Sequence, residues 1–428
     1  MPLLSIVVAA YNVDRYIARC LDSLVHQSCN DIEVVVVNDG STDSTLSIIQ
    51  QFAASDDRVH IINKHCNEGT HLARKSGVAA THGDYVMFVD GDDELELTSA
   101  EVLLQHAIKR DFDILRFGRS VIPESTVSQT EAWATEASFN AVYPQKKGID
   151  IVTSIFSDVT PFRQTWCVID CVFSGDFVRA SFSCMTSGRL GRMQDAYEFF
   201  VLASRAHVML GFPEFHGLRY HFGAGVSGTS MESIDRFQRG QEGMHFSTMA
   251  VMQYAGNSEN QVLISCSQWF LLAVIGIVGR EWCTRLNRDD QLAAVDMLRN
   301  TWGDIYTAGI ILEPLLPRAR YVNSSGRYPD VRDEYVCWTQ ALQQLDMSEC
   351  SNSVICNWLE EYRSIAAQIE EREQARLAEQ SRREQEQREA RRLFKSGTWP
   401  RRMLDRYFPE GGWCRRTLRK VACLILRR

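Results

Sequence analysis

The chain has 428 residues, a length that predicts roughly two to three domains, and 45% of its residues are hydrophobic, enough for a sizeable core. Its 54 acidic residues outnumber its 46 basic ones and give a formal net charge of -8. This acidic excess argues against general nucleic-acid binding, so no nucleic-acid partner is expected.

The 13 cysteines are scattered along the chain, and no CxxC pair occurs among them. Without metal spacing or a secretory signal, they are expected to be free thiols in a reducing cytoplasm. The N-terminal segment MPLLSIVVAAYN is apolar but has no basic start and no cleavage-site pattern, so we do not predict a signal peptide. The most apolar internal run, WFLLAVIGIVG from Trp269 to Gly279, is shorter than the roughly 20 residues that span a bilayer and predicts a buried helix.

Strands and helices are predicted to alternate over the first third of the chain. Apolar and β-branched runs indicate four buried strands, at 4–10, 32–39, 58–64 and 85–90. Helices are expected between them, at 14–28, 40–54 and 70–83. Repeated strand–helix–strand units predict an α/β fold with a mostly parallel sheet covered by helices on both faces.

Polar residues and glycines stand at the carboxyl ends of three of these strands: Tyr11 and Asn12, then Asn38, Asp39 and Gly40, then Asp90, Gly91, Asp92 and Asp93. Ligands of open α/β sheets bind beyond the carboxyl ends of the strands. We therefore expect a ligand site at this rim of the sheet.

The remaining chain changes character several times. The expected segments are two halves of one α/β domain at 1–112 and 113–230, a helical domain at 231–350, a charged helix or weak coiled coil at 351–394, and a basic amphipathic tail at 395–428. Residues 358–392 contain no Gly or Pro, and pairs such as Glu379 and Arg383 place the acid four residues before the base, as favours a solvated helix. Whether the chain forms a homodimer through this helix is left open by the sequence.

The tail combines basic with aromatic and aliphatic residues. From Pro400 to Arg428 it has eight Arg and one Lys against Asp405 and Glu410, a net charge of +7. Such a composition indicates a segment that lies on an anionic membrane surface. The alternative is a basic helix packed on the acidic body of the protein.

The stretch FVDGDDEL, from Phe88 to Leu95, places three aspartates and a glutamate directly after a strand. Crowded like charges raise the pKa of at least one carboxyl group. Mg²⁺ prefers one or two carboxylates together with waters and substrate phosphate oxygens. The cluster therefore predicts a divalent metal, Mn²⁺ or Mg²⁺, that holds a diphosphate; a solvated acidic turn is the alternative.

Three motifs occur in a familiar order: AAYN at 9–12, VVVNDGSTDST at 35–45 and NEGTHLARKSGVAATHGDYVMFVDGDD at 67–93. Together they resemble glycosyltransferase family 2, over the first ~100 residues and more faintly through Ser230. The resemblance implies a GT-A fold and an inverting transfer of a sugar from a nucleotide-diphosphate donor, with UDP as the default nucleotide. Two departures are Ala9, where the family often has Pro, and Lys75, where its ARN triplet has Asn.

The resemblance also implies roles for individual residues. The nucleotide-sugar donor would be bound by Tyr11, Asn12, Asp39, Arg74, Asp90 and Gly91, and the metal by Asp92, Asp90 and His221. An aromatic ring can stack on a base, and a carboxylate can accept hydrogen bonds from a pyrimidine N–H or a ribose hydroxyl. Arg74 is expected as a cation near the ribose or diphosphate. Gly69 and Gly83 are interpreted as turn residues.

On the acceptor side, an inverting transfer needs a general base for the attacking hydroxyl. The family usually has a Glu–Asp pair before a helix, and this sequence has Gln194 and Asp195 there. Asp195 is assigned as the base, with a carboxylate favoured by the helix dipole as the alternative. Trp166 resembles an aromatic residue on the acceptor side, and core packing explains it equally well.

The sequence thus predicts a metal-dependent inverting glycosyltransferase whose acceptor is a glycan or lipid-linked hydroxyl in cell-envelope polysaccharide synthesis. It is expected in the cytoplasm, peripheral on the inner face of the cell membrane through the basic tail. The alternative is a catalytically inactive GT-A-like protein that binds nucleotide or serves as a scaffold at the membrane. A Rossmann dehydrogenase and a P-loop enzyme are disfavoured, because neither GxGxxG nor GxxxxGK[ST] follows the first strand.

Overall fold

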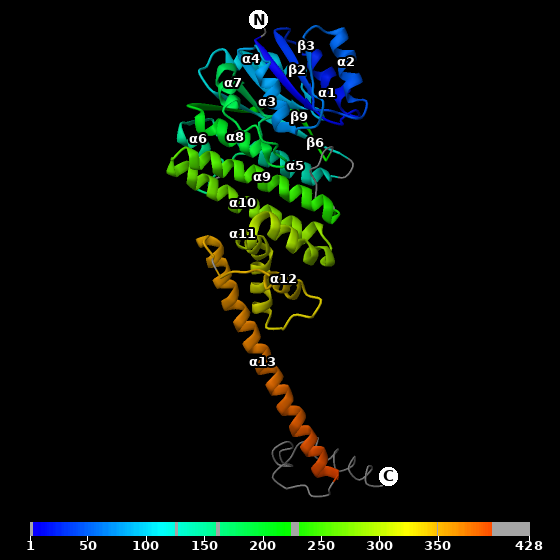
Figure 1. Ribbon diagram of the computed structural model, residues 1–428, viewed down its shortest axis with the longest axis vertical. Coiled ribbons are helices and arrows are strands. Elements are labelled where there is room, and N and C mark those ends of the chain that lie inside the picture. Colours follow the sequence, from blue (N-terminus) through cyan, green and yellow to red (C-terminus); the bar gives the residue numbers. More distant parts are fainter. Residues whose placement is uncertain (1–2, 125–126, 160–162, 224–230, 349, 396–428) are drawn as a thin grey trace. The chain divides into compact units, whose positions relative to one another are not determined.

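The computed structural model describes residues 3–124, 127–159, 163–223, 231–348 and 350–395 (Figure 1). The chain divides into two compact units. The first comprises Met1–Leu315 with Cys337–Cys356, and the second comprises Leu316–Val336 with Asn357–Arg428. The finer division into five segments stays a prediction.

A nine-stranded sheet forms the centre of the first unit. Its strands are β1 (Leu4–Ala10), β2 (Ile32–Asn38), β3 (Val59–Asn63), β4 (Tyr85–Asp90), β5 (Glu94–Leu95), β6 (Ile114–Pro123), β7 (Gln145–Lys147), β8 (Cys171–Ser174) and β9 (Val208–Phe222). The order across the sheet is β3-β2-β1-β4-β8-β6-β9-β5, and β7 pairs with β9. Strands from both predicted halves of the α/β domain therefore belong to one sheet.

The first four strands are parallel, as the sequence predicts. Strands buried on both faces read as continuous apolar runs, and β2 is buried along its whole length. In the register, Ala10 of β1 lies opposite Asn38 of β2. On its other side, Ala9 lies opposite Asp90 of β4. The later strands add antiparallel pairs of β8 with β4 and β6, so the complete sheet is mixed.

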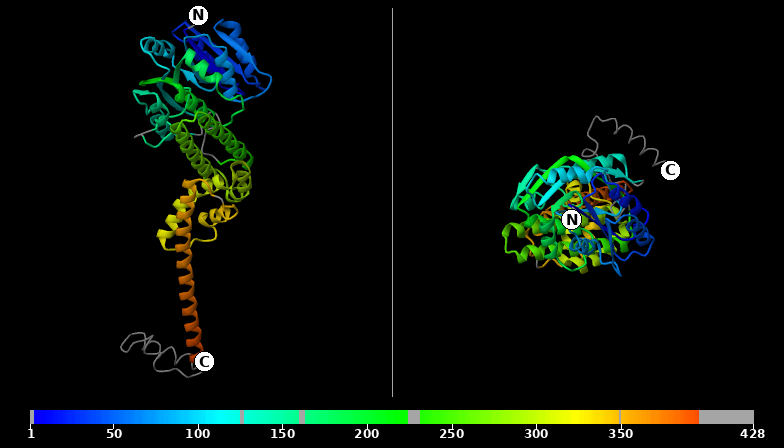
Figure 2. Two further views of the ribbon diagram at one scale, coloured as in Figure 1. Left: turned by 60° about the vertical axis from the view of Figure 1, so that its left-hand side comes forward. Right: turned by 90° about the horizontal axis from the view of Figure 1, so that it is seen from above.

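Helices flank this sheet (Figures 1 and 2). They are α1 (Ile17–Val25), α2 (Thr45–Ser55), α3 (Thr70–Ala79), α4 (Ser99–Ala107), α5 (Gln129–Phe139), α6 (Ile149–Thr153), α7 (Gly175–Ser183) and α8 (Gln194–Arg205). Helix α3 packs closely on β1, since a Cβ atom added at Gly77 would lie 2.4 Å from Val7 Cγ1. A side chain there would push α3 away from the sheet.

Long helices follow the sheet: α9 (Ile234–Asn257), α10 (Gln261–Arg285), α11 (Arg288–Ser325), which is kinked at Gly303, and α12 (Glu334–Leu342). The apolar run from Trp269 to Gly279 lies in α10, and Phe270, Val274 and Ile275 of this run are buried. Among the described residues, α10 is the one helix long and apolar enough to cross a membrane, and 56% of its most apolar window is buried in the protein. A buried core helix has the same properties.

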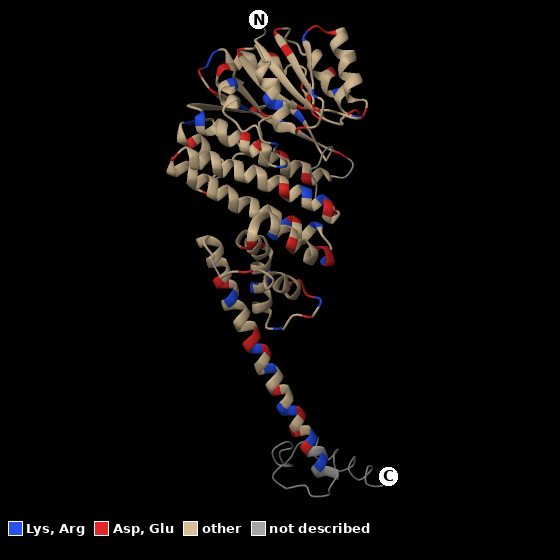
Figure 3. Ribbon diagram, in the orientation of Figure 1, with Lys and Arg blue, Asp and Glu red and all other residues tan. Residues whose placement is uncertain are grey.

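Among the described residues, the second unit is formed largely by α13 (Ser353–Lys395) from Asn357 onwards, along which acidic and basic residues alternate (Figure 3). The predicted pair of Glu379 and Arg383 is present, with Oε1 accepting from Nε at 2.8 Å. Of the predicted tail at 395–428, all but Lys395 lies outside the described residues. The expectation of free thiols is wrong for one pair, because Cys350 and Cys356 form a disulfide.

Candidate functional site

The carboxyl end of β2 holds the loop that follows β3. The carboxylate of Asp39 is buried and accepts hydrogen bonds from the backbone N–H of Gly69 at 2.7 Å and of Glu68 at 3.1 Å. Lys64 Nζ lies 3.7 Å from the same carboxylate. Gly69 has a φ of 95°, in the left-handed region that favours glycine, as expected of a turn residue. Asp39 therefore anchors the start of α3 at the rim.

The end of β1 is joined to the loop after β2. Asn12 has a φ of 52°, and its Oδ1 accepts from the backbone N–H of Thr42 at 2.8 Å. The backbone N–H of Asn12 donates to Ser41 Oγ at 3.0 Å. Tyr11 beside it is 43% exposed, which leaves its ring available to stack on a planar group.

The acidic turn follows β4 and is largely buried. Burial, followed by the charge of Asp90, raises the pKa of Asp92 to about 6. Burial and the charges of Asp92 and Asp90 raise the pKa of Asp93 well above its usual range. One oxygen of Asp93 accepts from the backbone N–H of His221 at 2.9 Å, and the other, Oδ2, has no hydrogen-bond partner. The turn packs closely at Gly91, since a Cβ atom there would lie 3.2 Å from Val13 Cγ2 and would have to displace it.

A divalent cation fits this donor set in part. In the described ranges, no group of three or more His, Cys, Asp or Glu residues is arranged to hold a metal. Two features nevertheless favour a cation: the carboxyl of Asp92 resists ionisation without one, and Asp93 has a buried oxygen that lacks a partner. A hard cation held by one or two carboxylates takes its other ligands from water and phosphate oxygens.

His221, which the sequence suggests as a metal contact, has a different environment in the structure. Its ring nitrogens lie 2.7 Å from Glu94 Oε1 and 3.1 Å from Glu124 Oε1, and the residue is 6% exposed. Both nitrogens are therefore occupied by carboxylates. Because its backbone N–H also holds Asp93, His221 connects β9 to the acidic turn.

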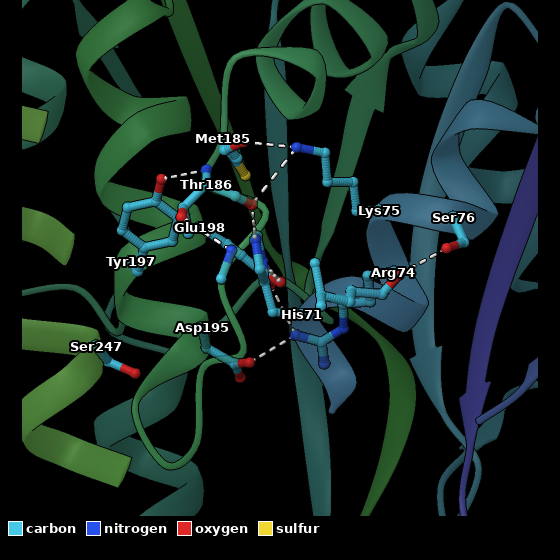
Figure 4. Close-up of polar contacts among 12 residues, drawn as sticks. His71, Arg74, Lys75, Ser76, Met185, Thr186, Asp195, Tyr197, Glu198 and Ser247 are labelled. Atoms are coloured by element: carbon cyan, nitrogen blue, oxygen red, sulfur yellow. Dashed lines mark hydrogen bonds and ion pairs between the residues drawn. The ribbon is translucent and has the colours of Figure 1, made fainter. Parts of the chain in front are cut away.

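Arg74 lies behind the rim, in contact with Asp90. It is 1% exposed, and its Nη2 donates to Asp90 at 2.7 Å. Its Nη1 donates to Asp195 at 2.5 Å and to Glu198 at 2.9 Å (Figure 4). Burial lowers the pKa of Arg74, but the charges of Asp195, Asp90 and Glu198 outweigh it and raise that pKa well above its usual range. The guanidinium is thus committed to carboxylates and joins α3, β4 and α8.

Asp195 lies in the first turn of α8, and its side chain is 22% exposed. Through Arg74 the structure brings it close to Asp90, although 105 positions separate the two in the sequence. One carboxylate at the donor rim and one on the opposite helix therefore bind the same guanidinium. This placement suits a base that acts beside a bound donor.

The loop before α8 is fixed by the long helices. Arg192 forms two ion-pair hydrogen bonds of 2.8 Å with Glu281 of α10, and Ser247 Oγ of α9 donates to its carbonyl oxygen at 2.8 Å. Gly191 packs against Gly243, since a Cβ atom at Gly191 would lie 2.6 Å from the Gly243 Cα. Helices α9 and α10 therefore help to place the start of α8.

Two site-proximal residues were not found by sequence reasoning. His71 and Glu198 are fully buried, and His71 Nδ1 lies 2.9 Å from Glu198 Oε1. A sequence signal existed: each lies three residues from a predicted site residue, Arg74 or Asp195, and so shares its helix face. Trp166, by contrast, packs against Phe156 and Phe270 with ring centroids 6.2 and 5.6 Å apart, so its contacts in the structure are those of core packing.

Residues 5–165 match the family model described as Glycosyl transferase family 2. This matched segment, the family 2 domain, is similar to proteins of glycosyltransferase family 2. Within this domain the chain is 39% identical over 118 residues to the uncharacterized glycosyltransferase EpsJ of Bacillus subtilis, a match that covers 28% of this chain and 34% of EpsJ. It is 40% identical over 109 residues to the chondroitin synthase of Pasteurella multocida, covering 26% of this chain and 11% of that protein. The matched segment thus spans about a third or less of these two relatives.

A solved structure extends the comparison beyond the family 2 domain. The fold is similar to that of S. aureus TarS 1-349, with a TM-score of 0.51 and 16% identity, over 80% of this chain and 91% of that one. The likeness confirms the predicted GT-A fold with helices following the sheet. Because the sequence identity is only 16%, the likeness is evidence for the fold alone.

Asp92 gives a test of the acidic turn. An acid whose pKa is raised by folding destabilises the folded state as the pH rises towards that value, because the unfolded chain ionises more easily. At pH 7.5, with a chelator present, Asp92→Asn should therefore raise the free energy of unfolding, by about 1–2 kcal/mol. Urea unfolding measures this change, and the gain should shrink at pH 5, where the wild-type carboxyl is protonated.

The control variant is Asp57→Asn, which changes an exposed carboxylate and should leave stability unaltered. If Asp92→Asn is no more stable than the wild type at pH 7.5, the acidic turn does not carry the charge repulsion described above.

Proposed function

We propose that the protein is a metal-dependent inverting glycosyltransferase that moves a sugar from a UDP-linked donor to a hydroxyl of a glycan or lipid-linked acceptor in cell-envelope polysaccharide synthesis. The family 2 domain supports the class of reaction. The names of relatives, among them a chondroitin synthase, support a polysaccharide product. The donor, acceptor and metal rest on the residues of the site.

The observation that carries the proposal is the pairing of two carboxylates on one buried guanidinium. Asp90 ends β4 at the rim where ligands of α/β sheets bind, and Asp195 lies in the first turn of α8 and binds the same guanidinium. The donor would lie along the rim, with the base of the nucleotide near Tyr11, Asn12 and Asp39. The acceptor hydroxyl would approach from the side of Asp195.

The reaction follows from these positions. Asp195 takes the proton of the acceptor hydroxyl as its oxygen attacks the anomeric carbon, and the bond from that carbon to the diphosphate oxygen breaks. The new bond forms on the face opposite the leaving group, so the configuration inverts. A divalent cation bound by Asp92 and Asp90 would supply charge neutralisation for the departing diphosphate. Arg74 contributes by holding Asp90 and Asp195 in place.

Donor binding at the rim can be measured directly by calorimetric titration with UDP, with and without Mn²⁺. The wild type should bind UDP more tightly when Mn²⁺ is present, because a cation held by Asp92 would neutralise the charge of the diphosphate. Asp92→Ala should lose most of this gain, about tenfold or more in affinity, whereas the exposed-site control Asp57→Ala should keep it.

Absence of UDP binding in the wild type would contradict UDP as the nucleotide. Binding without turnover across UDP-sugars and glycan acceptors would instead favour an inactive, nucleotide-binding protein.

The base is tested by Asp195→Asn, which keeps the shape of the side chain but cannot accept the proton. We expect sugar transfer to fall by about 100-fold or more while UDP binding is retained. The matched control is Asp235→Asn, because Asp235 is also the second residue of its helix, α9, and can contribute only through the helix dipole. Equal losses in the two variants, or full activity of Asp195→Asn, would exclude Asp195 as the base.

The proposed membrane contact rests on the composition of the tail alone, since residues 396–428 lie outside the described part of the chain. Its excess of basic residues should bind anionic lipid, with the protein peripheral on the cytoplasmic face of the membrane. In a sedimentation assay the full chain should bind vesicles containing phosphatidylglycerol and be released by salt. A variant ending at Lys395 should stay in the supernatant, and equal binding by both would contradict the proposal.

A further inference from the structure

Beneath the proposed base, α3 and α8 enclose a buried ion network (Figure 4). Glu198 is 0% exposed, and its two carboxylate oxygens have different partners. Oε2 accepts from Arg74 Nη1 at 2.9 Å, and Oε1 lies 2.9 Å from His71 Nδ1. A buried carboxylate is costly unless it is paired and hydrogen-bonded, and both conditions hold here.

His71 fixes the orientation of Glu198. The imidazole is fully buried, and its second nitrogen, Nε2, lies 3.0 Å from the carbonyl oxygen of Thr186. The same short segment is held from two more directions. Lys75 Nζ donates to the carbonyl oxygen of Met185 at 2.5 Å, and the backbone N–H of Thr186 donates to Tyr197 Oη at 2.8 Å. The ring therefore has little freedom to turn, and Glu198 is held with it.

The essential feature is that Asp195 and Glu198 share one nitrogen. Arg74 Nη1 donates to both, at 2.5 and 2.9 Å, while Nη2 serves Asp90. A carboxylate that holds a guanidinium alone is a weak base, because the cation stabilises its charged form. A second carboxylate on the same nitrogen draws part of that stabilisation away. It also prevents the guanidinium from moving towards the donor rim.

We propose that Glu198, oriented by His71, is a positioning residue: by sharing Arg74 Nη1 with Asp195 it keeps the proposed base both in place and able to accept a proton. The role of Asp195 as the base rests on the proposed function, whereas the sharing of Arg74 rests on the hydrogen bonds seen in the structure. Glu198 touches neither donor nor acceptor in this scheme and acts only through Arg74.

The kinetic test is Glu198→Gln, which keeps the size of the side chain and removes its charge. We expect kcat to fall by about tenfold or more, with KM for the donor and the Kd for UDP within about twofold of the wild type. Glu198→Asp, which keeps the charge, should recover part of the loss. The matched control is Glu33→Gln, because Glu33 is also a buried glutamate paired with a histidine, His82, but lies on β2. Its kcat should equal that of the wild type even if its stability falls.

An unchanged kcat in Glu198→Gln, or an equal loss in Glu33→Gln, would overturn the positioning role. A second measurement does not depend on activity: a double-mutant cycle of Glu198→Gln and Asp195→Asn, followed by urea unfolding. Sharing of one nitrogen predicts non-additive changes, since removing either carboxylate strengthens the pairing of the other with Arg74. Additive changes would refute the sharing. A wild type that transfers no sugar would refute the proposed function instead, while the cycle would still decide whether Arg74 is shared.

Discussion

The candidate site depends on one buried cation. Arg74 is the point at which the donor rim, the helix carrying the proposed base and the buried pair of His71 and Glu198 meet. A guanidinium is planar and always charged, and it presents donors in a fixed fork, so it can fix the relative positions of several carboxylates at once. A lysine would supply the charge but not the geometry. The close packing of α3 on β1, through Gly77 and Val7, places Arg74 where this geometry is needed.

The charge at the rim is uneven. The guanidinium of Arg74 neutralises Asp90 on one side of the turn, whereas Asp92 and Asp93 keep their protons more tightly than exposed carboxyls do. The charges of His221 and Arg19 lower the pKa of Asp92, but burial and the charge of Asp90 outweigh them. Binding of a cation should therefore be more favourable at this turn than at a solvated acidic loop, because the cation relieves a repulsion between carboxylates that exists before it binds.

How far the sequence predicts this site depends on how local each signal is. Parallel strands of continuous apolar residues bring their ends to one edge, so the proximity of Asp39 and Asp90 to Tyr11 follows from pattern alone. The direction in which Arg74 points cannot be predicted in this way. An arginine at this position would look the same in the sequence whether it contacts a diphosphate or is buried against carboxylates. The partners of His221 are Glu94 of β5 and Glu124, which directly follows β6, and no spacing along the chain reveals them. In the sequence, Glu198 and His71 are recognisable only as polar residues on helix faces that are expected to be buried.

The support of the loop before α8 by Glu281 and Ser247 has a consequence for how such proteins diversify. The match to the family model ends at residue 165, whereas Asp195 and the helices that hold its loop all lie beyond it. Substitutions in the acceptor-facing half, with its helical scaffold, can therefore leave the donor-facing residues in place. The two halves can then evolve at different rates, but only as long as an arginine is kept between them.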